Sequence, residues 1–255
     1  MKIFAVGDIV GSTGIRMLRE HLPGLKKQHG LELTIVNGEN AAMLGILPEQ
    51  ADQIFDAGAD VITLGNHAFS RKEIGGYMQN NKFIIRPLNM APGNPGEGFI
   101  TLNAGAFKVL IVNLIGRCFM DFAPDNPFFA ADKIIDREKA DLVIVDFHAQ
   151  ATSEKLAMAH YLNGRAGVVF GTHTHVQTAD EFILPGGLGY ISDLGMTGPA
   201  ESILGVQPHQ SINYFLGQIK ERYQTAPGPG QLNGCVFTIG ANGKCTGAER
   251  VFIRE

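Results

Sequence analysis

The chain has 255 residues, of which 45% are hydrophobic and 18% charged, and its formal net charge is −4. This ordinary globular composition excludes a disordered chain, and the slightly acidic balance argues against duplex nucleic acid as a partner. Three widely spaced cysteines are too few, and odd in number, for a disulfide framework. The length allows one large domain over residues 1–255, or one domain with a small appendage.

The N-terminal apolar run is short and is interrupted by Gly7 and Asp8, which is unlike a signal peptide. No stretch of the sequence approaches the roughly 20 apolar residues that a membrane helix needs. We therefore expect a cytoplasmic protein with no membrane partner.

In the first part of the chain, strand-like runs alternate with helical patterns. Residues 2–7, 33–36 and 61–64 are short apolar runs rich in β-branched residues. A helix is expected over residues 13–21, with a bend at Pro23, and another over residues 48–57, with proline in its first turn. This alternation predicts parallel strands joined by helices.

The remainder of the chain mixes helices with more strands. A helix capped by Asn126 is expected to reach about residue 139, and another, capped by Ser153, covers residues 154–162. Strand-like runs occupy residues 107–114, 142–145, 168–170, 188–191, 236–239 and 251–253. Together these patterns favour a two-sheet α/β sandwich. The irregular segments near residues 70–82, 117–130 and 195–230 are expected to form a small cap.

Side chains of metal-ligand type follow several of these predicted strands. In open α/β sheets, ligands gather at the carboxyl ends of the strands. Oxygen and imidazole donors without cysteine suit manganese, iron or zinc. The candidate metal ligands are Asp8, Glu39, Asn40, Asn66, His148, His173 and His175, with His67 beside them.

Taken singly, each of these residues has an ordinary structural explanation. An aspartate after a strand is usually a turn or cap residue, and a lone histidine is usually a surface or core residue. The spacing of His173 and His175 would place both imidazoles on one face of an extended segment. It is the occurrence of all of them in order at strand ends that predicts a metal site.

At these residues the sequence resembles the calcineurin-like metallophosphoesterase superfamily. The motifs of that superfamily correspond here to Gly7-Asp8, Glu39-Asn40, Gly65-Asn66-His67, His148 and His173-Thr174-His175. Two positions depart from its usual pattern, because Val10 stands where a histidine is usual and Glu39 where an aspartate is usual. Both departures, with stretches around residues 116–120, 171–180 and 191–199, resemble the YmdB-like metallophosphoesterases of bacteria, and the similarity covers roughly residues 1–205.

The resemblance implies a four-layer α/β/β/α sandwich with a small cap and phosphodiesterase activity on cyclic nucleotides, chiefly 2′,3′-cyclic ones. It implies two metal ions, with iron favoured, manganese as the alternative, and zinc or magnesium less favoured. By the family pattern, one ion is held by Asp8, Glu39, Asn40 and His175, and the other by Glu39, Asn66, His148 and His173. Glu39 bridges the two ions, and Asn40 compensates for the missing histidine at position 10.

A pair of metal ions would generate a bridging hydroxide near neutral pH, and this hydroxide would attack phosphorus. His67, one residue past a ligand, is the candidate general acid for the leaving ribose oxygen, or else a structural histidine. Arg117 is a candidate substrate contact through its forked guanidinium, or else a solvated surface residue. Asp146 is a candidate for orienting the His148 ring.

Other functions remain open from the sequence. A phosphomonoesterase or nucleotidase could use the same site, because loops decide specificity. A non-catalytic regulatory protein that uses the metal site as a sensor is a third hypothesis. The expected partner is a small cyclic nucleotide or another phosphodiester, and a homo-oligomer is compatible with the sequence without being indicated by any feature of it.

Overall fold

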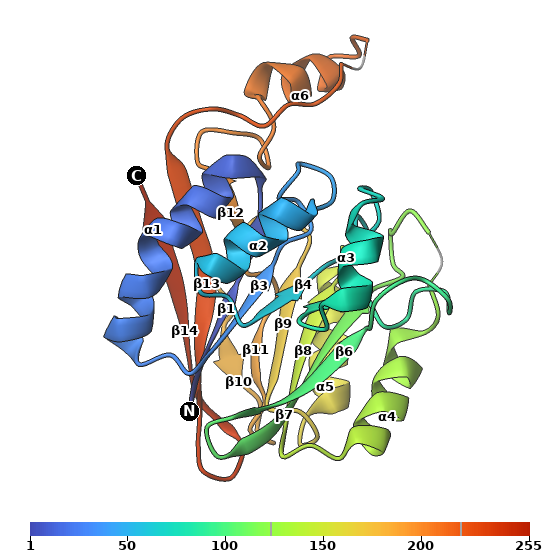
Figure 1. The fold of residues 1–255 in the computed structure, drawn as a ribbon, viewed down its shortest axis with the longest axis vertical. Coiled ribbons are helices and arrows are strands. Elements are labelled where there is room, and N and C mark those ends of the chain that lie inside the picture. Colours follow the sequence, from blue (N-terminus) through green and yellow to red (C-terminus); the bar gives the residue numbers. More distant parts are fainter. Residues whose placement is uncertain (123, 220) are drawn as a thin grey trace.

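The computed structural model describes residues 1–122, 124–219 and 221–255, which form two mixed β-sheets flanked by helices (Figure 1). The strands of the first sheet are, in spatial order, β2 (Asp8–Ile9), β12 (Met196–Pro199), β13 (Gly230–Ile239), β1 (Lys2–Val6), β3 (Leu33–Asn37), β4 (Val61–Thr63) and β5 (Ile84–Ile85), with β14 (Cys245–Arg254) paired to β13. The strands of the second sheet are β10 (Phe182–Ile183), β11 (Gly189–Ile191), β9 (Val168–Thr172), β8 (Leu142–His148), β7 (Phe107–Ile115) and β6 (Phe99–Ala104).

Parallel strands form the centre of both sheets. In the first sheet β1, β3, β4 and β5 run parallel, and in the second sheet β7, β8, β9 and β11 do. Antiparallel strands lie outside these centres, such as β13 against β1 and β6 against β7. Because parallel strands end at the same edge of a sheet, the residues that follow them are brought together.

The helices are α1 (Gly11–His29), α2 (Pro48–Asp56), α3 (Ile74–Asn80), α4 (Pro127–Glu138), α5 (Thr152–Leu162) and α6 (Pro208–Phe215). Three hydrophobic clusters join them to the sheets. The first cluster combines α1, α2 and α3 with the first sheet, the second lies between the two sheets, and the third combines α4 and α5 with the second sheet.

Strand β1 shows how the sequence builds two of these clusters at once. Side chains alternate between the two faces of a strand. Phe4 and Val6 accordingly enter the cluster beneath α1 and α2, whereas Ile3 and Ala5 enter the cluster between the sheets. All four side chains are fully buried, so this strand is apolar on both faces, as expected of a strand in the interior of a sheet that is covered on both sides.

Two helix boundaries differ from those expected. The helix expected over residues 13–21 is in fact α1, which continues past Pro23 to His29, and its C-cap Gly30 has the left-handed conformation with φ 65°. Buried Leu22 and Leu25 keep this extension packed, which compensates for the hydrogen bond that a proline removes. The helix expected from residue 154 begins at Thr152, with Ala151 rather than Ser153 at its N-cap. The prediction of Asn126 as a cap is confirmed, because its side chain accepts a hydrogen bond from Phe128 N.

The segments expected to form a cap contain short helices. Helix α3 lies in the first of them and α6 in the third, and Figure 1 shows α6 projecting beyond the sheets at the top of the molecule. Residues 123 and 220, which fall within the second and third expected cap segments, lie outside the described residues. Whether these segments act as a cap stays a prediction, as does the single-domain assignment.

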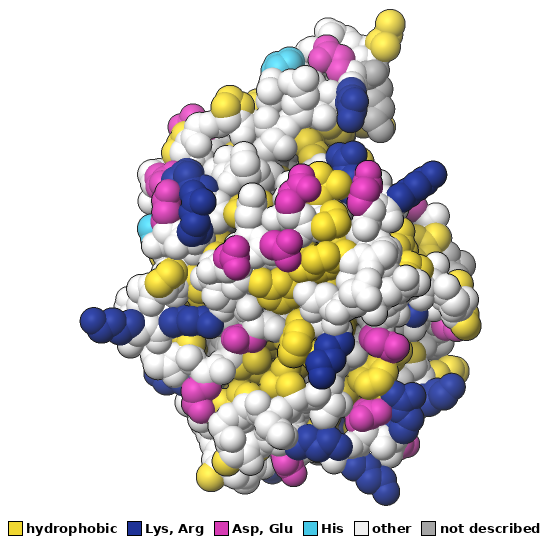
Figure 2. Space-filling view, viewed as in Figure 1, with side chains coloured by type: hydrophobic (Ala, Val, Ile, Leu, Met, Phe, Trp, Pro, Cys, Tyr) yellow, Lys and Arg dark blue, Asp and Glu magenta, His cyan; other side chains and the backbone are white. Residues whose placement is uncertain are grey.

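The surface seen in Figure 2 carries acidic and basic side chains interspersed with one another, without a continuous basic patch on that face. Within the described ranges of the chain, no helix is long and apolar enough to cross a membrane.

Two glycines of helix α1 provide a matched test of its packing. A Cβ at Gly14 would lie 2.3 Å from Thr197 O of β12, whereas a Cβ at Gly24 would meet no atom within 4 Å. We expect Gly14→Ala to lower the free energy of unfolding by about 1–3 kcal/mol through overpacking. Gly24→Ala should raise it by about 0.5–1 kcal/mol, because glycine disfavours a helix interior. Urea denaturation of both variants measures this, and equal effects would contradict the close packing of α1 on β12.

Candidate metal centre

The predicted ligands come from both sheets and meet at one edge. Glu39 and Asn40 follow β3, Asn66 follows β4, and His148 is the last residue of β8. The remaining three are Asp8, His173 and His175, of which Asp8 begins β2 and the histidines follow β9. Each lies next to the carboxyl end of a parallel strand or in the short strand that continues from β1, which is why the fold brings them together.

One group of ligand atoms surrounds the His148 ring. His148 Nε2 lies 3.0 Å from Glu39 Oε1, 2.9 Å from Asn66 Oδ1 and 3.0 Å from His173 Nδ1. Ligand atoms of Glu39, His148 and His173 all lie within 4.8 Å of one another, close enough to hold one ion. The residues in contact here are those that the resemblance assigns to one metal.

A second group surrounds His175. Asn40 Nδ2 lies 3.1 Å from His175 Nε2 and donates to Glu39 Oε1 at 3.2 Å, and Asp8 Oδ1 lies 3.8 Å from His175 Nε2. Rotating the Asn40 amide by half a turn would place its oxygen, the atom that can bind a metal ion, where its nitrogen now lies. Val10 forms a β-bridge with Asn40, so the residue that replaces the usual histidine lies beside the residue expected to compensate for it.

Two further observations fit bound cations. Asp8 Oδ1 is buried and has no hydrogen-bond partner among the described residues, which is costly for a carboxylate oxygen unless a cation balances it. A Cβ at Gly65 would lie 2.4 Å from both Glu39 Oε2 and His148 Nε2. Only glycine therefore leaves room for these two ligands to face one another. The residues fit a metal centre, while the number and identity of its ions stay predictions.

Glu39 and His148 shift each other's pKa values strongly. Burial acts to raise the pKa of Glu39, but His148 and the backbone N–H of His67 outweigh it and hold this pKa at about 2. Burial acts to lower the pKa of His148, but Glu39 and Asp8 raise it to about 9. In the metal-free chain, a proton on His148 thus neutralises the buried carboxylate where a metal ion would otherwise do so.

The pKa values of Asp8 and His173 are shifted so that each side chain is less readily charged. Burial raises the pKa of Asp8 to about 6, although His175 and His148 oppose this rise. Burial and the neighbouring His148 lower the pKa of His173 to about 3. An imidazole that stays neutral has a lone pair free for a metal ion.

Buried polar groups fix the orientation of the His148 ring. His148 Nδ1 lies 2.9 Å from Thr172 Oγ1, which donates to Asp146 Oδ1 at 2.8 Å. The other oxygen of Asp146 accepts from Thr63 and Asn37. Asp146 was expected to orient His148, and the structure places the Thr172 hydroxyl between the two.

A buried ion pair that the sequence did not reveal supports the loop of His173 and His175. Lys155 Nζ lies 2.7 Å from Asp193 Oδ2, and both side chains are only 1% exposed. The same oxygen accepts from Thr174 N at 3.0 Å, between the two histidines. His173 and His175 both have positive φ, 102° and 64°, so this loop has an unfavourable backbone conformation that needs such support.

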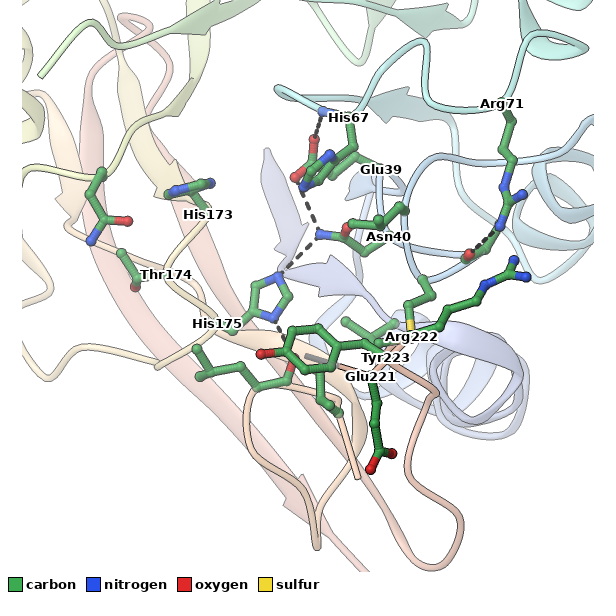
Figure 3. Close-up of a pocket in the computed structure, with 17 residues that line it drawn as sticks. Glu39, Asn40, His67, Arg71, His173, Thr174, His175, Glu221, Arg222 and Tyr223 are labelled. Carbon is green, nitrogen blue, oxygen red and sulfur yellow. Dashed lines mark hydrogen bonds between the residues drawn. The ribbon is translucent and has the colours of Figure 1, made fainter. Parts of the chain in front are cut away.

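A hollow of about 580 Å³ opens beside the ligands (Figure 3). Glu39, Asn40, His173 and His175 line it, and so does His67, the predicted general acid. Burial lowers the pKa of His67, with Glu39 opposing, so its imidazole is neutral in the metal-free chain. An anionic phosphate bound beside it would raise this pKa again.

The hollow also contains two arginines, Arg71 and Arg222, that were not singled out from the sequence. Both come from segments without a regular hydrophobic pattern, so their positions could not be inferred. Arg117, the predicted substrate contact, is exposed and lines a separate hollow with Cys118 and Asp121. The structure does not bring Arg117 into the hollow beside the ligands, and its role stays a prediction.

The His148 pKa leads to a pH test on the metal-free protein. Because the folded-state pKa of about 9 exceeds the ordinary value of 6.5, the stabilisation is complete below pH 6.5 and is lost as the pH rises through 9. Urea denaturation of metal-free protein between about pH 6 and 9.5 should show this decline. His148→Asn should flatten the decline, whereas His160→Asn, at an exposed site on α5, should not. An identical decline in both variants would contradict the assignment.

The buried ion pair gives a second test. Lys155→Met leaves Asp193 charged and unpaired, which should cost about 3–5 kcal/mol of folding free energy and weaken metal binding. The double variant with Asp193→Asn should recover part of the stability. Arg165→Met is a matched control, because its 2.6 Å pair with Asp132 is 38% and 32% exposed and should contribute at most about 1 kcal/mol. Denaturation and metal titration calorimetry measure both effects, and a Lys155→Met protein with unchanged metal affinity would contradict the supporting role.

Comparison with known proteins places this geometry in a family. The chain is 41% identical to a protein of Bacillus subtilis (strain 168) named 2′,3′-cyclic-nucleotide 2′-phosphodiesterase, covering 100% of this chain and 98% of that protein. A crystal structure of a hypothetical protein from Thermus thermophilus superposes with a TM-score of 0.94 at 38% identity, covering 100% of both chains. A structure described as a novel phosphatase from Mycoplasma pneumoniae gives 0.93 at 35% identity, covering 100% of this chain and 93% of that one. Residues 4–251 match the model of the YmdB-like protein family, and this chain belongs to that family.

Proposed function

We propose that this protein is a dinuclear-metal phosphodiesterase that hydrolyses 2′,3′-cyclic nucleotides at the 2′ ester and so yields nucleoside 3′-phosphates. The observation that carries the proposal is the pair of ligand groups that share Glu39 beside a hollow of about 580 Å³. The activity for which the Bacillus subtilis relative is named supports the choice of substrate, because the two chains are similar over almost their whole lengths.

We assign one ion to Asp8, Glu39, Asn40 and His175 and the other to Glu39, Asn66, His148 and His173. The donor set of oxygen and imidazole suits iron, manganese or zinc. On the family resemblance we favour iron, with manganese as the alternative and zinc or magnesium less favoured. When bound, such a pair of ions supplies a deprotonated water near neutral pH and neutralises charge on the phosphate.

The chain itself would orient the substrate and handle its leaving group. The imidazoles of His173 and His175 line the hollow, and the Thr172 hydroxyl holds the ring of His148. His67, with Nε2 3.2 Å from Asn66 Nδ2, is positioned at the wall of the hollow to donate a proton to the departing ribose oxygen. The bound phosphate would favour the protonated form that this role requires.

The architecture that would support this chemistry is a four-layer α/β/β/α sandwich. The three hydrophobic clusters, one between the sheets and one on the outer face of each, agree with this layering. We assign residues 1–255 to a single catalytic domain. The segment that carries α6 is the best candidate for a cap, because residues on both sides of this helix, such as Val206 and Arg222, line the hollow.

A phosphomonoesterase is the second candidate. The Mycoplasma pneumoniae structure is described as a phosphatase, and the curated relative from that organism as a putative phosphatase/phosphodiesterase. A non-catalytic sensor role is less well supported, because it would not require a residue such as His67 at the wall of the hollow.

Activity assays separate these functions. Metal-loaded protein should convert 2′,3′-cyclic AMP into 3′-AMP and should turn over p-nitrophenyl phosphate far more slowly. Glu39→Gln removes the carboxylate common to both ligand groups and should abolish turnover. His67→Gln should lower kcat by about 10²–10⁴-fold while metal content is retained. His160→Gln serves as the control. Turnover of the monoester with none of the cyclic diester would overturn the phosphodiesterase assignment.

A further inference from the structure

Arg71 reaches the hollow from the loop that follows His67. Its Nη2 donates to Ala42 O at 3.0 Å, and its side chain packs so closely that a Cβ at Gly45 would lie 2.9 Å from Arg71 Cγ. Arg71 Nε is buried and has no acceptor among the described residues. The guanidinium is therefore held in place while part of its hydrogen-bonding capacity is unused.

Arg222 reaches the same hollow from the segment beyond α6. The backbone of this segment is fixed by buried Gln210, whose Nε2 donates to Arg222 O at 3.0 Å and whose Oε1 accepts from Gln224 N at 2.8 Å. The Arg222 side chain itself is exposed. In Figure 3 the guanidinium groups of Arg71 and Arg222 extend toward the same end of the hollow, on the side away from His173 and Thr174.

Among the described residues, no carboxylate pairs with either arginine. The ion pairs within 4.0 Å include neither Arg71 nor Arg222. Glu221 also lines the hollow, but its Oε2 accepts from Gln210 Nε2 at 3.5 Å. In Figure 3 its carboxylate points away from both guanidinium groups. Two like charges facing one concave site repel each other unless an anion lies between them.

We propose that Arg71 and Arg222 form a second phosphate subsite, so that the preferred substrate is a 2′,3′-cyclic nucleotide that also bears a phosphate on its 5′ oxygen. This inference rests on the proposed function. Guanidinium groups bind phosphate oxygens through paired, charge-assisted hydrogen bonds. With the cyclic phosphate at the metal ligands, the 5′ oxygen lies at the other end of the ribose, and a phosphate there points away from the ligands. A hollow of about 580 Å³ has room for a nucleotide.

Two sources provide this chemistry. One is a mononucleotide with a 5′-monophosphate, and the other is the last nucleotide of an RNA that ends in a 2′,3′-cyclic phosphate. The test compares adenosine 2′,3′-cyclic phosphate, its 5′-phosphorylated form, and a dinucleotide with a 2′,3′-cyclic end. We expect kcat/KM to be at least about tenfold higher for the two phosphorylated substrates than for adenosine 2′,3′-cyclic phosphate. One hydrogen bond to a charged group contributes a factor of about this size.

In the variants Arg71→Gln and Arg222→Gln, the ratio of kcat/KM for phosphorylated to unphosphorylated substrate should fall toward one. The corresponding lysine variants should retain part of the preference. Arg19→Gln is the matched control, because it removes one positive charge at an exposed position of α1 and should keep the preference. A preference for both phosphorylated substrates assigns the contact to the phosphate itself, and a preference for the dinucleotide alone identifies the RNA end as the source.

Equal kcat/KM for all three substrates in the wild-type protein, or a preference unchanged in both glutamine variants, would overturn the subsite. Direct binding, measured by titration calorimetry, provides a readout that does not depend on turnover. Adenosine 3′,5′-bisphosphate should bind about tenfold more tightly than adenosine 3′-monophosphate, and this difference should be lost in Arg71→Gln. If no cyclic substrate is hydrolysed, the proposed function fails while the binding experiment still tests the subsite.

Discussion

The contact between Glu39 and His148 joins the two sheets of this protein at their carboxyl edges. Glu39 follows β3 of the first sheet and His148 ends β8 of the second, and their side chains are 1% and 0% exposed. Removing both groups from water is unfavourable, so the contact persists only if a proton or a cation balances the carboxylate. The packing of the two sheets at this edge therefore depends on whether a proton or a metal ion occupies the centre.

Buried hydrogen bonds hold the residues around this contact in fixed positions. Thr172, supported by Asp146, fixes the Nδ1 edge of the His148 ring. Asp193 fixes the backbone between the other two histidines. Each of these supports is buried and engaged in hydrogen bonds, so its geometry is set by the core rather than by solvent. Such an arrangement holds ligands in place before an ion arrives, which reduces the reorganisation that binding requires.

The sequence predicted which side chains meet at the centre better than it predicted the residues around them. Strand ends such as those before Glu39 and His148 are marked by hydrophobic runs, and parallel strands bring their ends together. Arg71 and Arg222 lie in segments with no such periodicity, and their positions depend on contacts distant in the chain. The Lys155–Asp193 pair could not be foreseen, because a lysine on a helix is normally solvated. The extension of α1 through Pro23 likewise depended on tertiary packing, which local propensity does not report.

The placement of Arg222 on a projecting segment has an evolutionary consequence. The ligands are embedded in the core, whereas this segment continues from α6, where Phe215 and Leu216 are 80% and 70% exposed. Substitutions there disturb few core contacts, so they can accumulate at little cost to folding. If Arg222 binds the second phosphate as proposed, a lineage could alter which phosphate esters it selects while the centre stays intact. Relatives with the same ligands then need not share a substrate.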